Sequence, residues 1–571
     1  MDSETPPLLS TAGSTRAAGA GTSTTRRMAV ATAAVAVVAT VLLVIFAALY
    51  AKQKNDASEL RRQVAAYEAM CGPDGCAPPS VVPHNASAAC RVPLPADLPT
   101  PAAIASEVRA AWAASTVRNA AIAAGSDLAA ADRAATVAAI PSWLNSSTIV
   151  VMRGGASSLM GFSDTDEAFV QESSFYYLTG LNVPDLALIA VPAAGALDYT
   201  LVVPHHDEQY AVWNGYVLDL DQWAAFSGFD HVIYDTQLEA RLANLTAPNG
   251  PASIVYTLPG TTPPLPVPVG VYVDQDKDRL LAALNTARGS KTPGELAALR
   301  RASQVSAEAH AVLMAGIQPG WYEYDAEAVF RLTNALCGNF DMSYLPIVGA
   351  GVNGAILHYS DNTARTTASD ILLIDAAANA LRYTSDITRT YPVDGTYSPH
   401  QAAIYNIVLA AHDAAVGVLA VGASYAAADA VATRHLVEGL INEGILVGDL
   451  DQVLASNVIK KFYPHGLGHA VGLDVHDPSV STFPPNFVGT IEPGIYFNDA
   501  LLGPALANPA LAPFINATAV NAYLAASFGG VRIEDVYIIH PNSDVENLST
   551  AAPRTIAAVE ALMATDDWFP V

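Results

Sequence analysis

The chain has 571 residues, more than one hydrophobic core usually organises, so two or more domains are expected. Hydrophobic residues make up 51% of it and charged residues 14%, which is typical of a globular protein. The net charge of −26 argues against a nucleic-acid partner, because a phosphate backbone would be repelled.

The first predicted element is a membrane anchor. Residues 28–50 (MAVATAAVAVVATVLLVIFAALY) carry no charge and follow a polar segment over 1–27. As a helix this run would be roughly 34 Å long, enough to cross a bilayer. A cleavable signal peptide is the alternative, but the length of both segments favours an uncleaved signal-anchor. The sequence therefore predicts a cytoplasmic tail over 1–27 and a transmembrane helix over 28–50.

Glycosylation acceptors suggest which side of the membrane the body occupies. Five Asn-X-Ser/Thr triplets follow the apolar run and none precedes it; they begin at Asn85, Asn145, Asn244, Asn516 and Asn547. Such triplets are glycosylated in secreted proteins. We therefore expect a single-pass type II membrane glycoprotein with a luminal or extracellular body.

The four cysteines fit an oxidising compartment. Cys71, Cys76 and Cys90 cluster after the apolar run, and Cys337 stands far downstream. A zinc site is conceivable, but CGPDGC has no fourth ligand nearby. A disulfide within the cluster is expected, which leaves one thiol for Cys337 or for a second chain.

The rest of the chain divides into a stalk over 51–104 and two domains. Strand-like runs at 147–154, 186–192, 199–206 and 270–274 alternate with helical stretches, and a Pro-rich hinge lies at 257–270. An amphipathic helix then opens with Pro293 at its first turn and Glu295 beside it, both typical of a helix start. We place the boundary so that the domains cover 105–287 and 288–571. Strands and helices of the second mix without a strict βαβ period, which indicates an α+β fold.

Four carboxylates in the second domain lie within or beside strand-like runs. Asp375 ends ILLID, Asp386 precedes ITRTYPV, and the residues between them could close a hairpin that sets the two side by side. Glu492 and Glu534 lie in similar apolar surroundings, where a charge is costly unless it is compensated. Close carboxylates repel one another, and a divalent cation would remove that repulsion.

Three histidines lie together in HGLGHAVGLDVHD: His465, His469 and His476. Gly466 and Gly468 make a regular helix unfavourable there. One imidazole with four carboxylates suits two hard or borderline divalent ions, such as Mn²⁺, Co²⁺ or Zn²⁺. Two such ions can share a hydroxide and polarise a carbonyl, the chemistry of metal-assisted amide hydrolysis.

These residues carry a family resemblance. The series Asp375, Asp386, His469, Glu492 and Glu534 resembles the metal-ligand series of the pita-bread metallopeptidases. The segments LHY, SDITRTYP, EPGIYF and GGVRIEDV resemble its prolidase and aminopeptidase P branch, and FVQESSFYYLTGLNVPD is similar to the N-terminal domain of that branch. The resemblance covers roughly 105–571. It implies a pita-bread catalytic domain preceded by a smaller α/β creatinase-like domain.

The resemblance also implies roles for individual residues. Asp375 would bind one metal ion, His469 and Glu492 the other, while Asp386 and Glu534 would bridge both; Mn²⁺ is expected first, with Zn²⁺ or Co²⁺ as alternatives. The implied catalytic residues are Glu492 as proton shuttle, His465 and His476 on the substrate's tetrahedral and imide groups, His358 on the substrate, and Arg532 on a ligand carboxylate.

The implied activity is hydrolysis of Xaa-Pro bonds in di- or oligopeptides by a metal-bridging hydroxide, first as a prolidase-like dipeptidase. Two alternatives remain: aminopeptidase P-like cleavage of longer peptides, and a non-catalytic binding protein on the same scaffold. Residues 477–491 contain no Arg or Lys that could hold the free carboxylate of a dipeptide, which favours longer substrates. A homodimer is also possible, since the family often dimerises.

Overall fold

The computed structural model describes residues 147–565 except 194–195, 216, 248–251, 259–263, 269–270 and 275–278, all within one compact unit, Pro83–Val571. The predicted tail, anchor and stalk (1–27, 28–50 and 51–104) lie outside these residues. Within them, no helix combines the length and apolar character that a membrane span requires.

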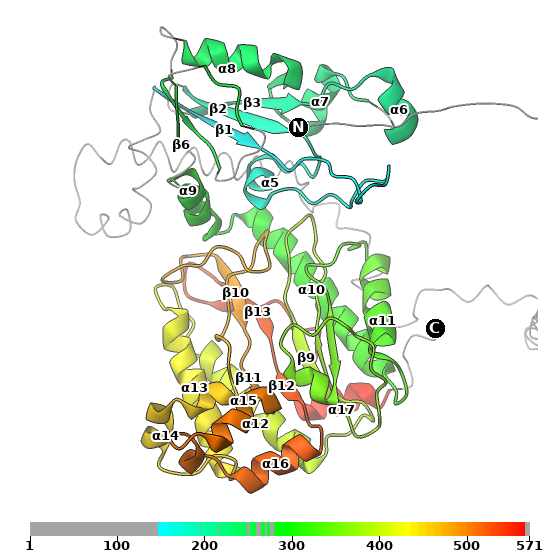
Figure 1. The fold of residues 1–571 in the computed structure, drawn as a ribbon, viewed down its shortest axis with the longest axis vertical. Helices are drawn as coiled ribbons and strands as arrows, with labels where there is room; N and C mark the ends of the chain where they lie inside the picture. The colour runs from blue at the N-terminus through cyan, green and yellow to red at the C-terminus, as the bar shows by residue number, and fades with distance from the viewer. Residues whose placement is uncertain are drawn as a thin grey trace, which may run out of the picture. The chain divides into compact units, whose positions relative to one another are not determined.

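The first part of the described chain forms a six-stranded sheet in the order β4-β3-β2-β1-β5-β6 (Figure 1). Its strands confirm the four strand-like runs and add two more: β1 (Thr148–Arg153), β2 (Ala187–Ala193), β3 (Ala196–Val203), β4 (His231–Tyr234), β5 (Ile254–Tyr256) and β6 (Tyr272–Asp274). The pairs β1–β2 and β2–β3 are antiparallel, and the other three are parallel.

Strand β1 shows why this sheet is covered on both faces. Side chains alternate between the faces of a strand, so Val150 and Met152 point one way and Ile149 and Val151 the other. The first pair packs in the core that includes α5 (Ser173–Thr179) and α9 (Arg279–Arg288), and the second in the core that includes α8 (Leu238–Thr246). Helices α6 (Glu208–Asn214) and α7 (Leu220–Ser227) lie between β3 and β4 in the chain.

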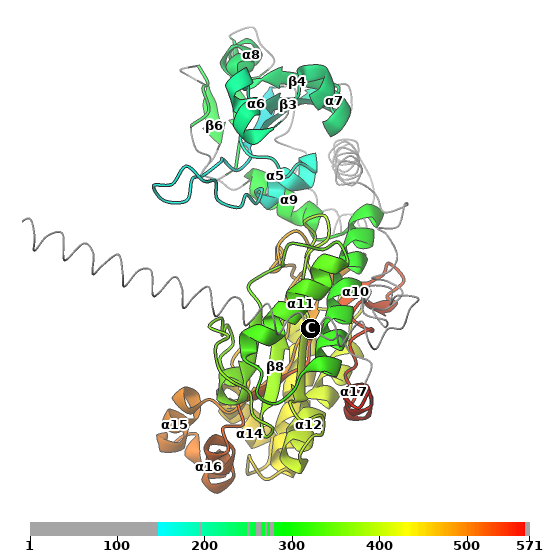
Figure 2. The ribbon, with the colours of Figure 1, turned by 90° about the vertical axis from the view of Figure 1, so that its right-hand side faces the viewer.

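Helix α10 (Pro293–Gly316) begins as its sequence predicts. The Thr292 hydroxyl accepts from the backbone N–H of Glu295, and the Glu295 carboxylate accepts from the backbone N–H of Thr292, which satisfies two N–H groups at the helix start. Helix α11 (Glu323–Leu336) packs along α10 and against β7 (Ile347–Ala350) (Figure 2).

The remaining strands form three small antiparallel sheets. These are β7 with β8 (Ile371–Asp375) and β9 (Thr388–Pro392); β10 (Phe487–Ile491) with β13 (Asp535–Ile539) and β14 (Val545–Asn547); and β11 (Gly494–Tyr496) with β12 (Gly530–Arg532). Strands β7 to β13 are buried throughout. The helices around them are α12 (Pro399–Val416), α13 (Tyr425–Asn442), α14 (Leu450–Ser456), α15 (Asp499–Ala507), α16 (Ala517–Ala525) and α17 (Ile556–Met563).

Cys337 follows α11 and is disulfide-bonded. The other cysteines of the chain, Cys71, Cys76 and Cys90, lie outside the described residues. The disulfide expected within that cluster therefore lies outside the described residues as well.

Candidate active site

The hairpin expected between the first two carboxylates is present. Asp375 is the last residue of β8, Asp386 lies two residues before β9, and the strands pair so that Asp375 is opposite Thr388. The Tyr344 hydroxyl lies 2.5 Å from Asp375 Oδ1 and 2.6 Å from Asp386 Oδ1. The two buried carboxylates therefore face the same point.

The two glutamates reach this point from the neighbouring sheets. Glu492 directly follows β10, and Glu534 lies between β12 and β13. The backbone N–H of Glu534 donates to the Thr388 carbonyl at 3.1 Å, and the Thr388 hydroxyl donates to Glu534 Oε2 at 2.6 Å. These bonds hold Glu534 against the start of β9, beside Asp386.

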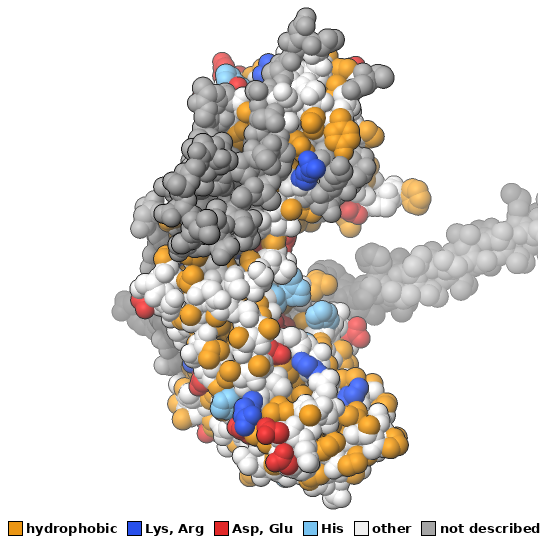
Figure 3. Space-filling model, turned by 90° about the vertical axis from the view of Figure 1, so that its left-hand side faces the viewer, with side chains coloured by type: hydrophobic (Ala, Val, Ile, Leu, Met, Phe, Trp, Pro, Cys, Tyr) orange, Lys and Arg blue, Asp and Glu red, His pale blue; other side chains and the backbone are white. Residues whose placement is uncertain are grey.

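The three histidines have different surroundings. His469 Nε2 lies 3.3 Å from Asp386 Oδ2 and 3.4 Å from Glu492 Oε1, so its ring faces the carboxylates. His465 Nε2 lies 2.9 Å from the Tyr496 hydroxyl. The ring centroid of His476 is 4.1 Å from that of His469. His358 and His476 are exposed, and histidine side chains are visible on the face drawn in Figure 3.

A cavity of about 210 Å³ brings all nine predicted site residues together. Its lining comprises His358, Asp375, Asp386, His465, His469, His476, Glu492, Arg532 and Glu534, together with Leu357, Gly466 and Gly468. Gly468 is required by close packing, since a Cβ there would lie 2.2 Å from the Thr490 carbonyl oxygen. Gly468 therefore lets the chain pass against β10, whereas a Cβ on Gly466 would meet no atom within 4 Å.

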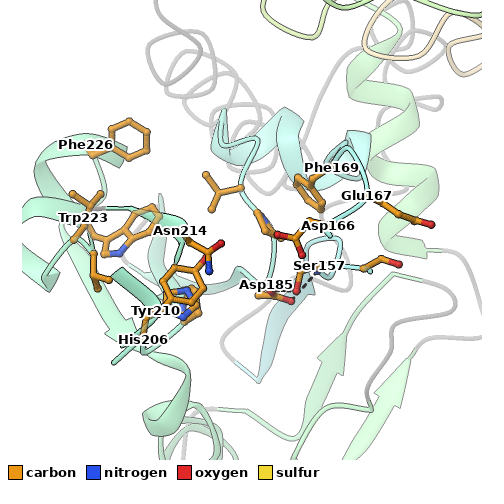
Figure 4. Close-up of a pocket in the computed structure, with 16 residues that line it drawn as sticks. Ser157, Asp166, Glu167, Phe169, Asp185, His206, Tyr210, Asn214, Trp223 and Phe226 are labelled. Carbon is orange, nitrogen blue, oxygen red and sulfur yellow. Dashed lines mark hydrogen bonds between the residues drawn. The ribbon is translucent and has the colours of Figure 1, made fainter. Parts of the chain in front are cut away.

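A larger cavity, of about 440 Å³, lies against the six-stranded sheet (Figure 4). Its walls carry the rings of Phe169, Tyr210, Trp223 and Phe226, and Asp185 at its edge accepts hydrogen bonds from Ser157. In the described chain, the groups of His and carboxylate ligands close enough to share an ion all occur in the smaller cavity. The smaller cavity is therefore the candidate active site.

Burial and mutual repulsion disfavour ionisation of the carboxylates. Burial, with Asp386 and Glu492 nearby, raises the pKa of Glu534 well above its usual value. Burial raises the pKa of Glu492 to about 7 and that of Asp375 to about 6. Asp386 differs: burial opposes its charge, but hydrogen bonding and attraction from His469 lower its pKa. Positive charge placed among them would relieve this repulsion.

The donor atoms fit divalent ions. Three overlapping groups have ligand atoms within 4.8 Å of one another: Asp375–Asp386–Glu534, His469–Glu492–Glu534 and Asp386–His469–His476. The first two share Glu534 and contain all five ligands that the sequence predicts. The two oxygens of Asp386 point to different sides, one toward Tyr344 and one toward His469. His476, predicted as a substrate group, is also within reach of an ion.

The site also contains two residues that were not predicted from the sequence, Tyr496 and Tyr344, and the predicted Arg532 binds the first of them. Arg532 donates through Nη2 to Asp375 and through Nη1 to the Tyr496 hydroxyl, which lies beside His465. Tyr496 stands inside the EPGIYF segment, which was a usable signal. Tyr344 lies in an irregular stretch before β7, and no local pattern distinguishes it.

Two family descriptions match the chain. Residues 130–256 match the aminopeptidase P N-terminal domain, and residues 297–541 match metallopeptidase family M24. A probable Xaa-Pro aminopeptidase of Uncinocarpus reesii is 32% identical over 444 residues, which cover 73% of this chain and 90% of that protein. One from Aspergillus niger is 32% identical over 429 residues, 70% of this chain and 90% of that protein.

Solved structures agree. A zinc-substituted Escherichia coli aminopeptidase P in complex with product is 27% identical, with a TM-score of 0.65 over 77% of this chain and 99% of that one. The Pseudomonas aeruginosa aminopeptidase PepP is 29% identical, with a TM-score of 0.64 over 76% of this chain and 97% of that one. The chain is a metallopeptidase that belongs to family M24, in its aminopeptidase P branch.

Proposed function

We propose that the protein is an Xaa-Pro aminopeptidase, which releases the first residue of peptides whose second residue is proline. The observation that carries this proposal is the single cavity in which all nine predicted site residues meet. The relatives support it, because those named as probable Xaa-Pro aminopeptidases match along about nine-tenths of their length.

The cavity favours this activity over the dipeptidase interpretation. A dipeptide has its free carboxylate next to the cleaved bond, and a cation would have to hold it. Among the described residues that line the cavity, Arg532 is the only lysine or arginine. Its N–H groups already donate to Asp375, Tyr496 and Thr388. Residues 477–491 supply no other cation. Peptides that extend beyond proline are therefore the better substrates.

Five residues would hold two divalent ions. Asp375 belongs to one site, His469 and Glu492 to the other, and Asp386 and Glu534 to both; the oxygen-rich set favours Mn²⁺ over a thiolate-preferring ion. When bound, these ions supply an activated water and polarise the scissile carbonyl.

The protein's own groups handle protons and orientation. Glu492, which lines the cavity beside His469, can accept a proton from the attacking water and pass it to the leaving nitrogen. Burial, with Arg532 nearby, lowers the pKa of His465 to about 3, so its ring is neutral. Its contact with the Tyr496 hydroxyl orients it toward the cavity. His358 and His476, both exposed in the lining, can contact the peptide.

Asp386→Asn tests the metal assignment. We expect the wild-type chain to bind about two Mn²⁺ ions, and the variant to lose at least one together with nearly all hydrolysis of Ala-Pro-Ala. Asp361→Asn, at an exposed site outside the cavity, is the matched control and should retain both. Full activity of the Asp386 variant would refute its role.

We also propose that the body is luminal or extracellular and anchored through 28–50. This placement is supported by the uncharged run and by the five acceptor triplets that follow it.

A further inference from the structure

His476 is held in place indirectly. Its side chain is exposed, and none of the hydrogen bonds recorded among the described residues involves its ring. Its position beside His469 must therefore come from the backbone of the 472–477 loop. Two acidic residues of this loop, Asp474 and Asp477, have no part in the proposed chemistry, and they make its strongest contacts.

Asp477 joins the loop to the last residue of α9 and to the segment that follows it. Its buried carboxylate lies 2.5 Å from Arg288 Nη2 and 2.9 Å from Lys291 Nζ, both of which are also buried. Its backbone N–H donates to the Ala470 carbonyl at 2.9 Å. The fit is tight, because a Cβ on Gly472 would lie 2.5 Å from this carboxylate. A carboxylate one residue from His476 is thus fixed on three sides.

Asp474 adds a second attachment. Its carboxylate lies 2.6 Å from Arg288 Nη2 and accepts a hydrogen bond of 2.5 Å from the Ser173 hydroxyl in α5. The Thr384 hydroxyl and backbone N–H both donate to the Gly472 carbonyl, at 2.9 and 2.8 Å. Thr384 lies two residues before Asp386, so the loop is also tied to the candidate metal site.

His469 is anchored separately. Its backbone N–H donates to the Thr490 hydroxyl at 3.1 Å, and its carbonyl accepts from the Tyr425 hydroxyl and from the Thr490 backbone N–H. These contacts belong to β10 and α13. Changes at Asp474 or Asp477 should therefore move His476 while leaving His469 in place.

We propose that Asp477 and Asp474, clamped by Arg288, Lys291 and Ser173, are positioning residues that set the place of His476 in the active site. A buried group of charges costs desolvation free energy, and a precise geometry is one benefit that can explain its retention. The kinetic test of this inference rests on the proposed function, whereas the hydrogen-exchange test does not.

Asp477→Asn would take from the buried Lys291 its ion-pair partner and from Arg288 one of two, and that variant can fail to fold. The test therefore uses Asp474→Asn. The Asp474 side chain is 47% exposed, so loss of its charge should cost less stability than loss of the Asp477 charge. Glu546→Gln is the matched control: Glu546 is 34% exposed and pairs with Arg300 at 2.7 Å, away from the cavity.

The kinetic test is a double-mutant cycle with His476→Ala, in the full chain with Mn²⁺ and Ala-Pro-Ala. We expect Asp474→Asn to lower kcat roughly fivefold in the wild-type background and less than about twofold in the His476→Ala background. Mn²⁺ affinity should stay within about twofold, since His469 is anchored elsewhere. Equal losses in both backgrounds, or a parallel loss of Mn²⁺ affinity, would overturn the proposal.

Amide hydrogen exchange of the metal-free full chain gives a readout without activity. Exchange across 472–477 should rise at least about fivefold in Asp474→Asn, with β10 unchanged, and Glu546→Gln should alter neither. Unchanged exchange in the loop would refute the clamp. A chain that cleaves no Xaa-Pro peptide but shows the exchange change would refute the proposed function and keep the clamp.

Discussion

The Arg532 guanidinium lies 2.6 Å from the Asp375 carboxylate, and both side chains are buried beside the candidate metal site. Arg532 also donates to the Tyr496 and Thr388 hydroxyls at 2.9 Å each. One side chain therefore orients a candidate ligand, the partner of His465 and the residue that holds Glu534. Groups that orient metal ligands in this way commonly contribute about 10- to 100-fold to metal affinity.

Arg532→Lys should weaken Mn²⁺ binding by about tenfold, because one ammonium cannot reach three acceptors in fixed directions. Calorimetric titration of the metal-free protein measures this. Arg434→Lys is the control, because Arg434 pairs with Glu438 on the surface and should leave the affinity unchanged. An unaltered affinity in Arg532→Lys would show that the guanidinium does not support the site.

Removal of one partner from the buried pair Arg389–Asp535 should cost far more stability than removal of one partner from a surface pair. Its atoms lie 2.6 Å apart with both side chains fully buried, and Arg389 also donates to the carbonyls of Glu534 and Ala552. Asp535→Asn should lower the free energy of unfolding by about 3 kcal/mol, since it leaves a buried charge unpaired. Glu438→Gln, at the exposed pair with Arg434, should cost no more than about 0.5 kcal/mol. Urea denaturation measures the free energy of unfolding of both variants. Similar losses in the two would contradict the prediction.

Glu295 should make stability depend on pH. Burial raises the pKa of this carboxyl from 4.5 to about 7, although Lys291 partly opposes the shift. A folded state that holds its proton more tightly is stabilised below the unfolded pKa, and that contribution is lost as pH rises toward 7. Glu295→Gln can keep the cap on Thr292 without this loss. Its stability relative to wild type should therefore rise between about pH 5 and about pH 7.5 in urea denaturation, and a constant difference would contradict the assignment.

Glycan mapping tests the proposed luminal placement. Asn244 is exposed on α8. The Asn516 amide instead donates to the Gly444 carbonyl at 2.8 Å, and the Asn547 amide donates to Asp535 and Tyr537. After expression through a secretory pathway, mass spectrometry should find a glycan on Asn244 and none on Asn516 or Asn547. An unmodified Asn244 would argue against a luminal body.

Much of the site follows from local pattern. A charge that interrupts an apolar strand needs compensation, which distinguishes Glu492 and Glu534. Two close carboxylates repel unless a cation lies between them, which distinguishes Asp375 and Asp386. The hairpin between the two aspartates is also local, because a short connection favours antiparallel pairing. Spacing alone cannot show that Glu492 and Glu534 reach the same point. The family resemblance supplied that expectation, and the pairing of β10 with β13 accounts for it.

The supporting residues depend on contacts between distant segments. Tyr344 meets the two aspartates through the packing of a segment without regular structure, and Arg288 meets Asp477 across 189 positions of sequence. No periodicity encodes such pairs. The sequence also does not fix the substrate preference: the relatives support the aminopeptidase alternative better than the dipeptidase, in agreement with the absence of Lys and Arg from residues 477–491.

The proposed Xaa-Pro aminopeptidase activity is tested most directly by a comparison of two peptides. Initial rates of the full chain with Mn²⁺ are measured on Ala-Pro-Ala and on the dipeptide Gly-Pro, with the metal-free protein as the blank. We expect metal-dependent release of the first alanine from the tripeptide and much slower hydrolysis of Gly-Pro. Hydrolysis of Gly-Pro as fast as that of the tripeptide would contradict the proposed activity.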